Sequence, residues 1–273
     1  MPTEVTSTPA GRPDCSSSSS MTAGTMRVLG GEVSPFTARA RLALDLRGVA
    51  YELLDEPLGP KKSDRLLAAN PVYGKIPVLL LPDGRAICES AVIVQYIEDV
   101  ARESGGAEAG SLLLPDDPYE RAMHRFWTAF IDDKFWPALD AVSLAPTPGA
   151  RAQAAEDTRA ALSLLEEAFK DRSNGRAFFS GGDAAPGLLD LALGCFLPAL
   201  RACERLHGLS LIDASATPLL DGWSQRFAAH PAAKRVLPDT EKVVQFTRFL
   251  QVQAQFRVHV ACQIQRLQSV LET

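Results

Sequence analysis

Residues 75–90 read KIPVLLLPDGRAICES, and this stretch decides the fold of the first third of the chain. Two apolar runs, at residues 78–81 and 86–88, flank the turn sequence at residues 82–84 and predict a β-hairpin. Ser90 follows the second strand and is a good cap for a helix, which we expect to run to Val100. The stretch therefore predicts two antiparallel strands that lead directly into a helix.

The segment before this hairpin alternates strands and helices. We expect a strand at residues 28–29, a helix from Ser34 to the stop signal at Arg47 and Gly48, a strand at 51–54 and a short helix at 63–69. The short helix should end at Asn70, because the residue before a proline is pushed out of the helical region. The order β-α-β-α-β-β-α predicts a small mixed sheet flanked by helices.

The rest of the chain has helical periodicity alone. We expect helices at residues 119–142, 150–171, 188–206 and 218–229, and from 240 onward. The sequence thus predicts an α/β domain followed by an all-α domain. The expected division is a disordered tail at 1–25, the α/β domain at 26–101, a linker at 102–116, the helical domain at 117–250 and an extension at 251–273. For the extension, a helical continuation and a frayed end are both open.

The composition excludes several classes of protein. Hydrophobic residues make up 46% of the chain and charged residues 22%, as in ordinary globular proteins. No apolar run approaches the roughly 20 residues that span a bilayer, so we expect no membrane partner. The net charge of -5 argues against nucleic acid, which needs clustered basic side chains. Five widely spaced cysteines predict free thiols in a reducing, cytoplasmic environment and no metal site.

Ser34 is the first candidate for chemistry. The sequence Ser34-Pro35-Phe36 follows a predicted strand and places a hydroxyl group at a helix N-terminus, where free N–H groups and the helix dipole favour an anion. The ordinary role of such a serine is to cap the helix, and this motif alone leaves both roles open. A serine hydrolase is not indicated, because there is no G-x-S-x-G sequence around Ser34.

A second candidate cluster consists of Lys62, Lys75, Ile76, Pro77, Glu89 and Ser90. A cis bond before Pro77 would leave neighbouring backbone groups free to pair with an extended ligand. Ser90 at a helix start offers a hydroxyl and an N–H group to a carboxylate, and the two lysines offer positive charge to a second one. One thiolate site and two carboxylate sites on a small α/β domain predict a receptor for a γ-glutamyl tripeptide.

Longer motifs carry a family resemblance. They are Ser-Pro-Phe-x-x-Arg-x-x-x-Ala-Leu-x-x-Arg-Gly-Val-x-Tyr-Glu at 34–52, Asn-Pro-Val-x-x-Lys-Ile-Pro-Val-Leu at 70–79, Glu-Ser-x-x-Ile-x-x-Tyr-Ile at 89–97, and in the helical half the segments 125–127, 131–134, 181–183, 190–193 and 237–239. In this order they resemble the tau-class plant glutathione transferases. The resemblance covers roughly residues 26–250 and implies a thioredoxin-like domain followed by an all-helical domain.

The resemblance implies a role for each matching residue. Ser34 would be the catalytic hydroxyl, a hydrogen-bond donor that keeps the glutathione thiol ionised. Lys62 and Lys75 would hold the glycyl carboxylate, although a length difference at 58–62 leaves Lys61 open as the alternative to Lys62. Ile76 would pair with the cysteinyl backbone, and Glu89 and Ser90 would take the γ-glutamyl end. The electrophile pocket would contain Phe36, Trp136, Phe246 and Leu250. Asp140 and Ser143 depart from the Arg and Trp often found at those pocket positions.

The resemblance also implies the reaction and the assembly. We expect conjugation of glutathione, as a co-substrate and with no cofactor, to hydrophobic electrophiles by a cytoplasmic homodimer that serves detoxification and stress response, with glutathione peroxidase as a side activity. Two alternatives are a noncatalytic carrier of apolar metabolites and a glutathione-dependent thiol reductase. The reductase would need a cysteine where this chain has Ser34.

Overall fold

The computed structural model describes residues 24–57, 59, 61–104, 113–180 and 182–271. For residues 255 and 257–271 the description covers the backbone alone. The tail expected at 1–25 lies almost entirely outside the described residues, and so does half of the linker expected at 102–116.

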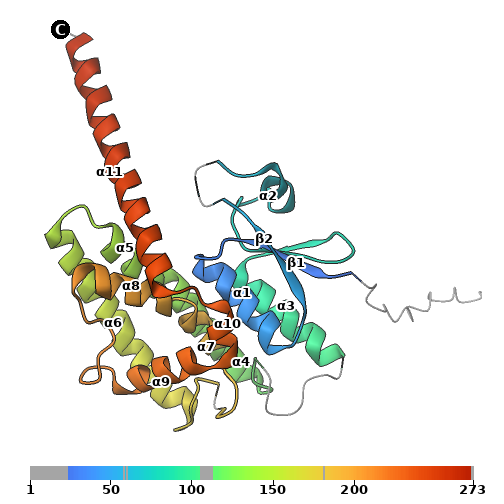
Figure 1. Cartoon of the computed structure of the whole chain (residues 1–273). Coiled ribbons are helices and arrows are strands. Elements are labelled where there is room, and N and C mark those ends of the chain that lie inside the picture. The colour runs from blue at the N-terminus through green and yellow to red at the C-terminus, as the bar shows by residue number, and fades with distance from the viewer. Residues whose placement is uncertain (1–23, 58, 60, 105–112, 181, 272–273) are drawn as a thin grey trace, which may run out of the picture.

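The first part of the chain forms a four-stranded sheet in the order β2-β1-β3-β4 (Figure 1). Its elements are β1 (Met26–Gly30), α1 (Pro35–Leu46), β2 (Tyr51–Asp55), α2 (Asp64–Ala69), β3 (Val78–Leu80), β4 (Ala86–Cys88) and α3 (Ser90–Glu103). β1 pairs with β2 in parallel and with β3 in antiparallel fashion, and β3 pairs with β4 as a hairpin. The predicted order of elements and the mixed sheet are confirmed.

The two faces of the sheet bury different side chains. Val28 packs in the large core with α1 and α3, whereas its neighbour Leu29 packs with Leu66 of α2 on the other side. This follows from the two-residue period of a strand, which sends successive side chains to opposite faces. The sheet therefore lies between α2 on one face and the pair α1 and α3 on the other.

The second part of the chain is helical. Its elements are α4 (Pro118–Phe130), a π-helix η1 (Ile131–Phe135), α5 (Trp136–Leu144), α6 (Pro148–Ser173), α7 (Leu188–Gly194), α8 (Leu197–His207), α9 (Pro218–Ala229), α10 (Pro231–Val236) and α11 (Thr240–Leu271). The single helix expected at 119–142 is thus interrupted by a π-turn. The helix expected at 188–206 is two helices, since Pro198 stands in the first turn of α8 and cannot continue the hydrogen bonds of α7.

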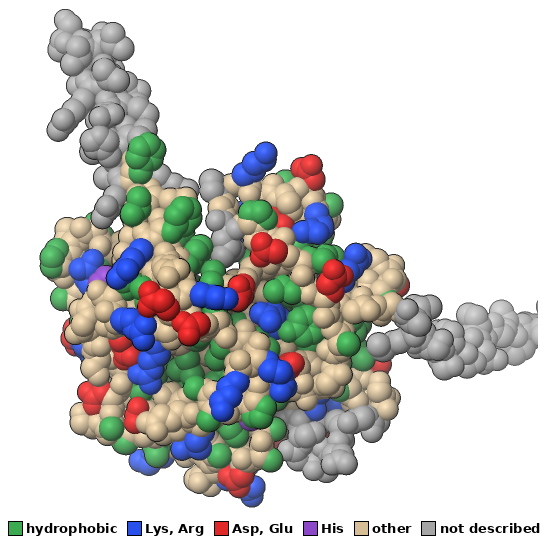
Figure 2. Space-filling model, viewed as in Figure 1, with side chains coloured by type: hydrophobic (Ala, Val, Ile, Leu, Met, Phe, Trp, Pro, Cys, Tyr) green, Lys and Arg blue, Asp and Glu red, His purple; other side chains and the backbone are tan. Residues whose placement is uncertain are grey.

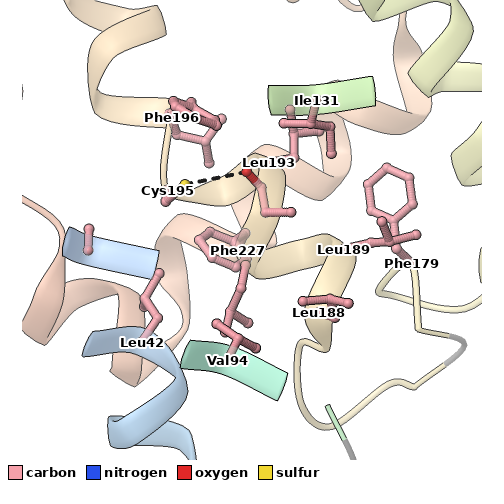
Figure 3. Close-up of a cluster of buried hydrophobic side chains, with 14 of the residues drawn as sticks. Leu42, Val94, Ile131, Phe179, Leu188, Leu189, Leu193, Cys195, Phe196 and Phe227 are labelled. Atoms are coloured by element: carbon pink, nitrogen blue, oxygen red, sulfur yellow. Dashed lines mark hydrogen bonds between the residues drawn. The ribbon is translucent and has the colours of Figure 1, made fainter. Parts of the chain in front are cut away.

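The two parts share one hydrophobic core. Figure 3 shows Leu42 of α1 and Val94 of α3 beside Leu188 of α7 and Phe227 of α9. The helices approach closely there: a Cβ atom added at Gly194 would lie 2.3 Å from the ring of Phe227, so only glycine fits. This continuous core fixes the sheet against the helices and so fixes the position of α1 relative to α5 and α8.

The last helix, α11, begins on the body and then leaves it (Figure 1). Val243 and Val244 are buried against Ala202 of α8. Further along, Phe249, Val252 and Phe256 are exposed, and hydrophobic side chains gather where α11 leaves the body (Figure 2). The first three turns of α11 are therefore the ones that contribute to the core and to the cavity described next.

Candidate active site

Ser34 caps α1 in a way that leaves its proton available. The chain turns from β1 into α1 through a hydrogen bond from the Ser34 N–H to the Gly31 carbonyl at 3.1 Å. The Ser34 Oγ then accepts a hydrogen bond from the Thr37 N–H at 3.3 Å. A hydroxyl group can accept and donate at the same time. Capping therefore occupies an acceptor position of Ser34 and leaves its O–H free to donate to an anion.

Two cavities meet at Phe36. The larger encloses about 230 Å³, and its described lining residues are Val33, Ser34, Pro35, Phe36, Trp136, Leu139, Asp140, Ser143, Leu144, Ala199, Val243, Phe246, Thr247 and Leu250. The smaller encloses about 110 Å³ and is lined by Phe36, Lys75, Ile76, Pro77, Glu89 and Ser90. A ligand in the smaller cavity would thus lie next to a ligand in the larger one.

Aromatic packing holds Phe36 between the cavities. Its ring meets Trp136 edge to face at 6.0 Å and Phe196 edge to face at 5.4 Å. Trp136 and Phe196 in turn stack at 4.8 Å. Such pairs add to the energy of apolar burial and favour one orientation. The wall that the two cavities share is therefore built by α1, α5 and the turn before α8.

The smaller cavity lies at the start of α3 and has the features of an anion site. Glu89, which precedes α3, has a φ of 68° and makes no side-chain capping bond, so the first N–H groups of α3 are not satisfied by it. A non-glycine residue with positive φ costs energy and is concentrated at functional sites. Ser90 is only 5% exposed and brings its hydroxyl to the cavity. Free N–H groups and a hydroxyl at a helix start favour a carboxylate.

The loop before β3 is fixed by Asn70, which the sequence indicated as the end of a helix and the start of the motif at 70–79. This buried amide donates to the Lys75 carbonyl at 2.9 Å and accepts from the Tyr73 N–H at 3.2 Å. The peptide between Ile76 and Pro77 is cis. Ile76 thus precedes the ladder that pairs Val78 with Cys88, and it lies in the cavity wall.

Arg39 connects the smaller cavity to the helical part, and its role was not predicted. The guanidinium group is fully buried and donates to the Ser90 Oγ at 3.1 Å, to both oxygens of Asp132 at 2.8 and 2.6 Å, and to the Ala192 carbonyl at 3.0 Å. It also lies over the ring of Phe36 at 5.4 Å. Arg39 therefore fixes the orientation of a hydroxyl in one cavity and of the aromatic wall between both.

The larger cavity is closed by two helices. Residues 136, 139, 140, 143 and 144 of α5 line it, a spacing that corresponds to one face of a helix. α11 forms the opposite wall and is held there by the ion pair of Lys242 with Glu32 at 2.6 Å and by the hydrogen bond from the Gln251 amide to the Ser143 carbonyl at 2.7 Å. Most of the wall is apolar, which suits a hydrophobic ligand.

Asp140 is the exception in that wall. Among the described lining residues it is the one ionisable side chain. Burial raises the pKa of Asp140 above the usual value of an aspartate. The sequence showed that this position departs from the family pattern. It did not indicate that the Asp140 carboxylate would have no ion-pair partner or hydrogen-bond donor among the described residues.

The structure brings most of the predicted site residues together. Ser34, Phe36, Trp136, Phe246 and Leu250 line the larger cavity, and Lys75, Ile76, Glu89 and Ser90 line the smaller one. Lys62 and the alternative Lys61 are exposed and line neither cavity. Leu139, Ala199, Val243 and Thr247 were not expected there, since the helical pattern of these residues is the same as that of core residues.

The histidine and cysteine side chains that the structure describes lie away from both cavities. Among the lining residues that the structure describes there is neither a histidine nor a cysteine. Burial lowers the pKa of His124 to about 4 and raises the pKa of Cys195 to about 11, so both remain neutral at physiological pH. No cluster of three potential metal ligands occurs in the described part of the chain.

Comparisons with known proteins agree on one family. A family model described as the N-terminal domain of glutathione S-transferase matches residues 33–100, and one for the C-terminal domain matches residues 148–226. Glutathione S-transferase U17 of Arabidopsis thaliana is 41% identical over 228 residues, which cover 84% of this chain and 96% of that protein. A probable rice glutathione S-transferase, GSTU6 of Oryza sativa subsp. japonica, is 45% identical over 229 residues, or 83% and 94% of the two chains.

Solved structures give the same result. The tau-class glutathione S-transferase of mango, Mangifera indica, superposes with a TM-score of 0.75 at 42% identity, covering 83% of this chain and 98% of the mango protein. Rice GST1 in complex with glutathione superposes with a TM-score of 0.73 at 34% identity, covering 84% and 97%. The similarity thus extends over both the sheet and the helices.

Proposed function

The chain belongs to the tau class of the glutathione S-transferases and conjugates glutathione, and from this premise we propose that the Ser34 hydroxyl is the catalytic hydrogen-bond donor. The observation that carries the proposal is that the Ser34 hydroxyl can cap α1 and donate a hydrogen bond at the same time. Its oxygen accepts from the Thr37 N–H, and its proton is left for a sulfur atom at the start of α1.

The energy of such a hydrogen bond is sufficient for the task. A free thiol has a pKa of about 8.5, so lowering it by about 2 units requires roughly 2.7 kcal/mol of thiolate stabilisation. A hydrogen bond to a charged group contributes about 1.5 to 3 kcal/mol, and a helix N-terminus adds to it. Ser34 acts as a donor in this scheme and forms no covalent bond.

We propose that glutathione lies along the smaller cavity. The γ-glutamyl carboxylate would bind at the start of α3, where Ser90 offers its hydroxyl and its N–H and where Glu89 offers a carboxylate to the α-amino group. The backbone of Ile76 would pair with the cysteinyl residue. Lys75 would hold the glycyl carboxylate together with Lys62 or its alternative Lys61.

We propose that the larger cavity receives a hydrophobic electrophile. Its walls include Phe36, Trp136, Phe246 and Leu250, and about 230 Å³ is enough for a substituted aromatic ring. Ser34 lines this cavity, and Phe36 lines both cavities. A thiolate held at Ser34 would therefore be next to the electrophile, which raises the effective concentration of the two reactants.

The wider role of the protein is part of the proposal. We infer a cytoplasmic enzyme of detoxification and stress response with glutathione peroxidase as a side activity. The apolar cavity supports the detoxification role, because it suits varied hydrophobic compounds. In the described part of the chain, no helix has the length and apolar character that crossing a bilayer requires. Acidic and basic side chains are mixed over the face shown in Figure 2.

We also propose a division of the chain and its assembly. The thioredoxin-like unit would comprise residues 26–101 and the helical unit residues 117–250, as the distribution of strands and helices supports. Two copies would form a homodimer. Large apolar side chains exposed on both units, among them Tyr73 and Phe126, support this assembly.

The substitution Ser34→Ala tests the catalytic role. We expect the turnover number with glutathione and 1-chloro-2,4-dinitrobenzene to fall about 10- to 100-fold, the value of one hydrogen bond to a charged group, while the dissociation constant of glutathione changes little. Thr147→Ala is the matched control, because Thr147 caps α6 by accepting from the Ala150 N–H at 3.1 Å and lines neither cavity. An unchanged turnover number at neutral pH in Ser34→Ala would contradict the proposal.

A further inference from the structure

The carboxylate of Asp140 is placed by α5 at the larger cavity. Trp136, Asp140 and Ser143 occupy successive turns on the face of α5 that lines it. Asp140 itself is partly buried. Its charge therefore acts on whatever occupies the cavity, with less screening than a surface charge would have.

Asp140, which is partly buried, differs from the more deeply buried acids of this protein. Glu166 accepts from two backbone N–H groups at 2.8 Å, and Asp190 accepts from four donors, including the Trp223 indole at 2.8 Å. Glu98 pairs with Arg102 at 3.0 Å and also with Arg47. Asp140, in contrast, has neither an ion-pair partner nor a hydrogen-bond donor among the described residues. A carboxylate with restricted access to water normally has such partners. No interaction among the described residues explains why Asp140 lies at this cavity.

The cations next to the cavity walls do not face Asp140. Lys242 of α11 pairs with Glu32, and Arg39, which packs on the Phe36 ring, is bound to Asp132 and Ser90. Lys134 and Arg248, each close in the sequence to a lining residue, are exposed and line neither cavity. The remaining polar lining groups that the structure describes are the neutral hydroxyls of Ser34, Ser143 and Thr247. The cavity thus combines apolar walls with one uncompensated negative charge.

We propose that Asp140 determines electrophile specificity: it favours hydrophobic electrophiles that carry a cationic group, such as an ammonium group, and discriminates against those that carry an anionic group. The inference rests on the proposed function, because it places the electrophile in the larger cavity next to a thiolate at Ser34. The apolar walls hold the hydrophobic part of the electrophile, and Asp140 supplies the missing opposite charge.

The electrostatics favour this assignment. Burial raises the pKa of Asp140 because water is removed from the carboxylate, and a bound cation compensates for that loss. An anionic substituent would instead bring a second negative charge into the same cavity, where like charges repel at short range. The thiolate adds to this repulsion. Selection is therefore expected from attraction of one class of substrate and from repulsion of the other.

Three conjugates of glutathione test the inference by calorimetry. The S-benzyl group carries a para methyl, aminomethyl or carboxyl substituent, so the three ligands differ in charge and little in size. For the unchanged protein we expect the aminomethyl conjugate to bind about tenfold more tightly than the carboxyl conjugate, the size of effect that about 1.4 kcal/mol of charge interaction produces. Asp140→Asn should reduce this ratio to near one, because it keeps the shape of the side chain and removes its charge.

The control is Asp171→Asn, which removes one exposed charge from α6 outside both cavities and should leave the ratio unchanged. A ratio near one in the unchanged protein, or an unaltered ratio in Asp140→Asn, would overturn the inference. The neutral methyl conjugate distinguishes failure of the inference about Asp140 from failure of the proposed function. If it binds all three proteins equally, the variants are folded and the proposed function stands; if it does not bind the unchanged protein, the proposed function falls and the inference with it.

Discussion

At the scale of single residues, Arg39 connects the proposed glutathione site to the rest of the protein. Its buried guanidinium group reaches Ser90 in one cavity, Asp132 in the π-turn and the backbone of α7. The charge is tolerated in the core because Asp132 compensates it with two hydrogen bonds. In the proposed function Arg39 is thus a positioning residue, which would act on the ligand through Ser90.

Asp132→Asn tests this connection. Removal of one partner of a buried ion pair leaves the other charge uncompensated, so we expect the free energy of unfolding to fall by about 3 kcal/mol. We also expect weaker glutathione binding, because Arg39 would no longer hold Ser90 in place. The KM of the electrophile should change less, because Trp136 and Phe196 still hold the Phe36 ring that Arg39 contacts. The exposed neighbour Asp133 provides the control Asp133→Asn.

A double-mutant cycle with Ser90→Ala decides whether the effect passes through Ser90. If it does, Asp132→Asn should weaken glutathione binding clearly less in the Ser90→Ala background than alone. Additive effects on the glutathione dissociation constant would show that Asp132 has only a structural role.

Both Arg39 and Asp132 belong to motifs recognised in the sequence, but their ion pair could not be predicted from it. Arg39 is part of the Ser-Pro-Phe-x-x-Arg motif and Asp132 is part of the motif at 131–134, 93 positions further on. Periodicity reveals which face of a helix is buried and not which distant side chain it meets. Ser34, Glu89 and Ser90 could be predicted as candidates because each lies at a local strand-to-helix junction. That Asp140 is the one ionisable side chain among the described lining residues could not be predicted, because this requires knowledge of every side chain around the cavity.

At the scale of elements, the strands and most helices were predictable because turn and cap residues mark their ends. Pro82, Asp83 and Gly84 mark the hairpin, and Ser34 and Ser90 mark helix starts. The π-turn at η1 was not predictable, because one wider turn hardly changes the apolar pattern of a long helix. Its consequence is functional: it lies between α4 and α5 and supplies Asp132 to Arg39 directly before Trp136 enters the cavity wall.

Truncation of α11 tests which part of this helix matters for activity. The described cavity residues on α11 end at Leu250, and Gln251 holds the helix to Ser143. A chain that stops after Gln251 should therefore retain its kcat/KM with 1-chloro-2,4-dinitrobenzene within about twofold, the effect of a few tenths of a kcal/mol.

The matched truncation stops after Asp239 and removes Val243, Phe246 and Leu250 from the cavity wall. We expect it to raise the KM of the electrophile at least about tenfold, while glutathione still binds in calorimetry, since a lost apolar wall of several side chains costs more than about 1.4 kcal/mol. Loss of activity in the longer chain would show that residues beyond Gln251 complete the site.

At the scale of the whole molecule, exposed apolar side chains support the proposed homodimer. Val72, Tyr73 and Val92 in the first part of the chain are 78%, 61% and 49% exposed, and Phe126 on α4 is 57% exposed. The Arg125 guanidinium of α4 donates to the Gln95 side chain of α3 at 2.7 Å, which links the two helices that carry Phe126 and Val92. A twofold dimer could cover these side chains with the same surface of a second copy.

Light scattering checks the assembly. We expect a mass of twice 29.4 kDa at micromolar concentration, and we expect Phe126→Glu to shift it toward the monomer, because a charge buried in an apolar interface is costly. Leu164→Glu on α6 is the control, since Leu164 is also about half exposed and lies on another helix. A monomeric unchanged protein with full activity would contradict the dimer and leave the glutathione site intact, because its proposed ligands come from one chain.

The position of α11 in the cavity wall has a consequence for biosynthesis. Glu89 and Ser90 leave the ribosome early, whereas Val243 and Leu250 leave it about 150 residues later, roughly 8 to 30 s at 5 to 20 residues per second. Asp132 and Ala192, which both accept hydrogen bonds from the Arg39 guanidinium, emerge between them. The residues of the two proposed substrate sites are therefore synthesised in a fixed order: those of the smaller cavity first, and the α11 wall of the larger cavity last. The proposed electrophile site is thus complete only when almost the whole described chain has been made.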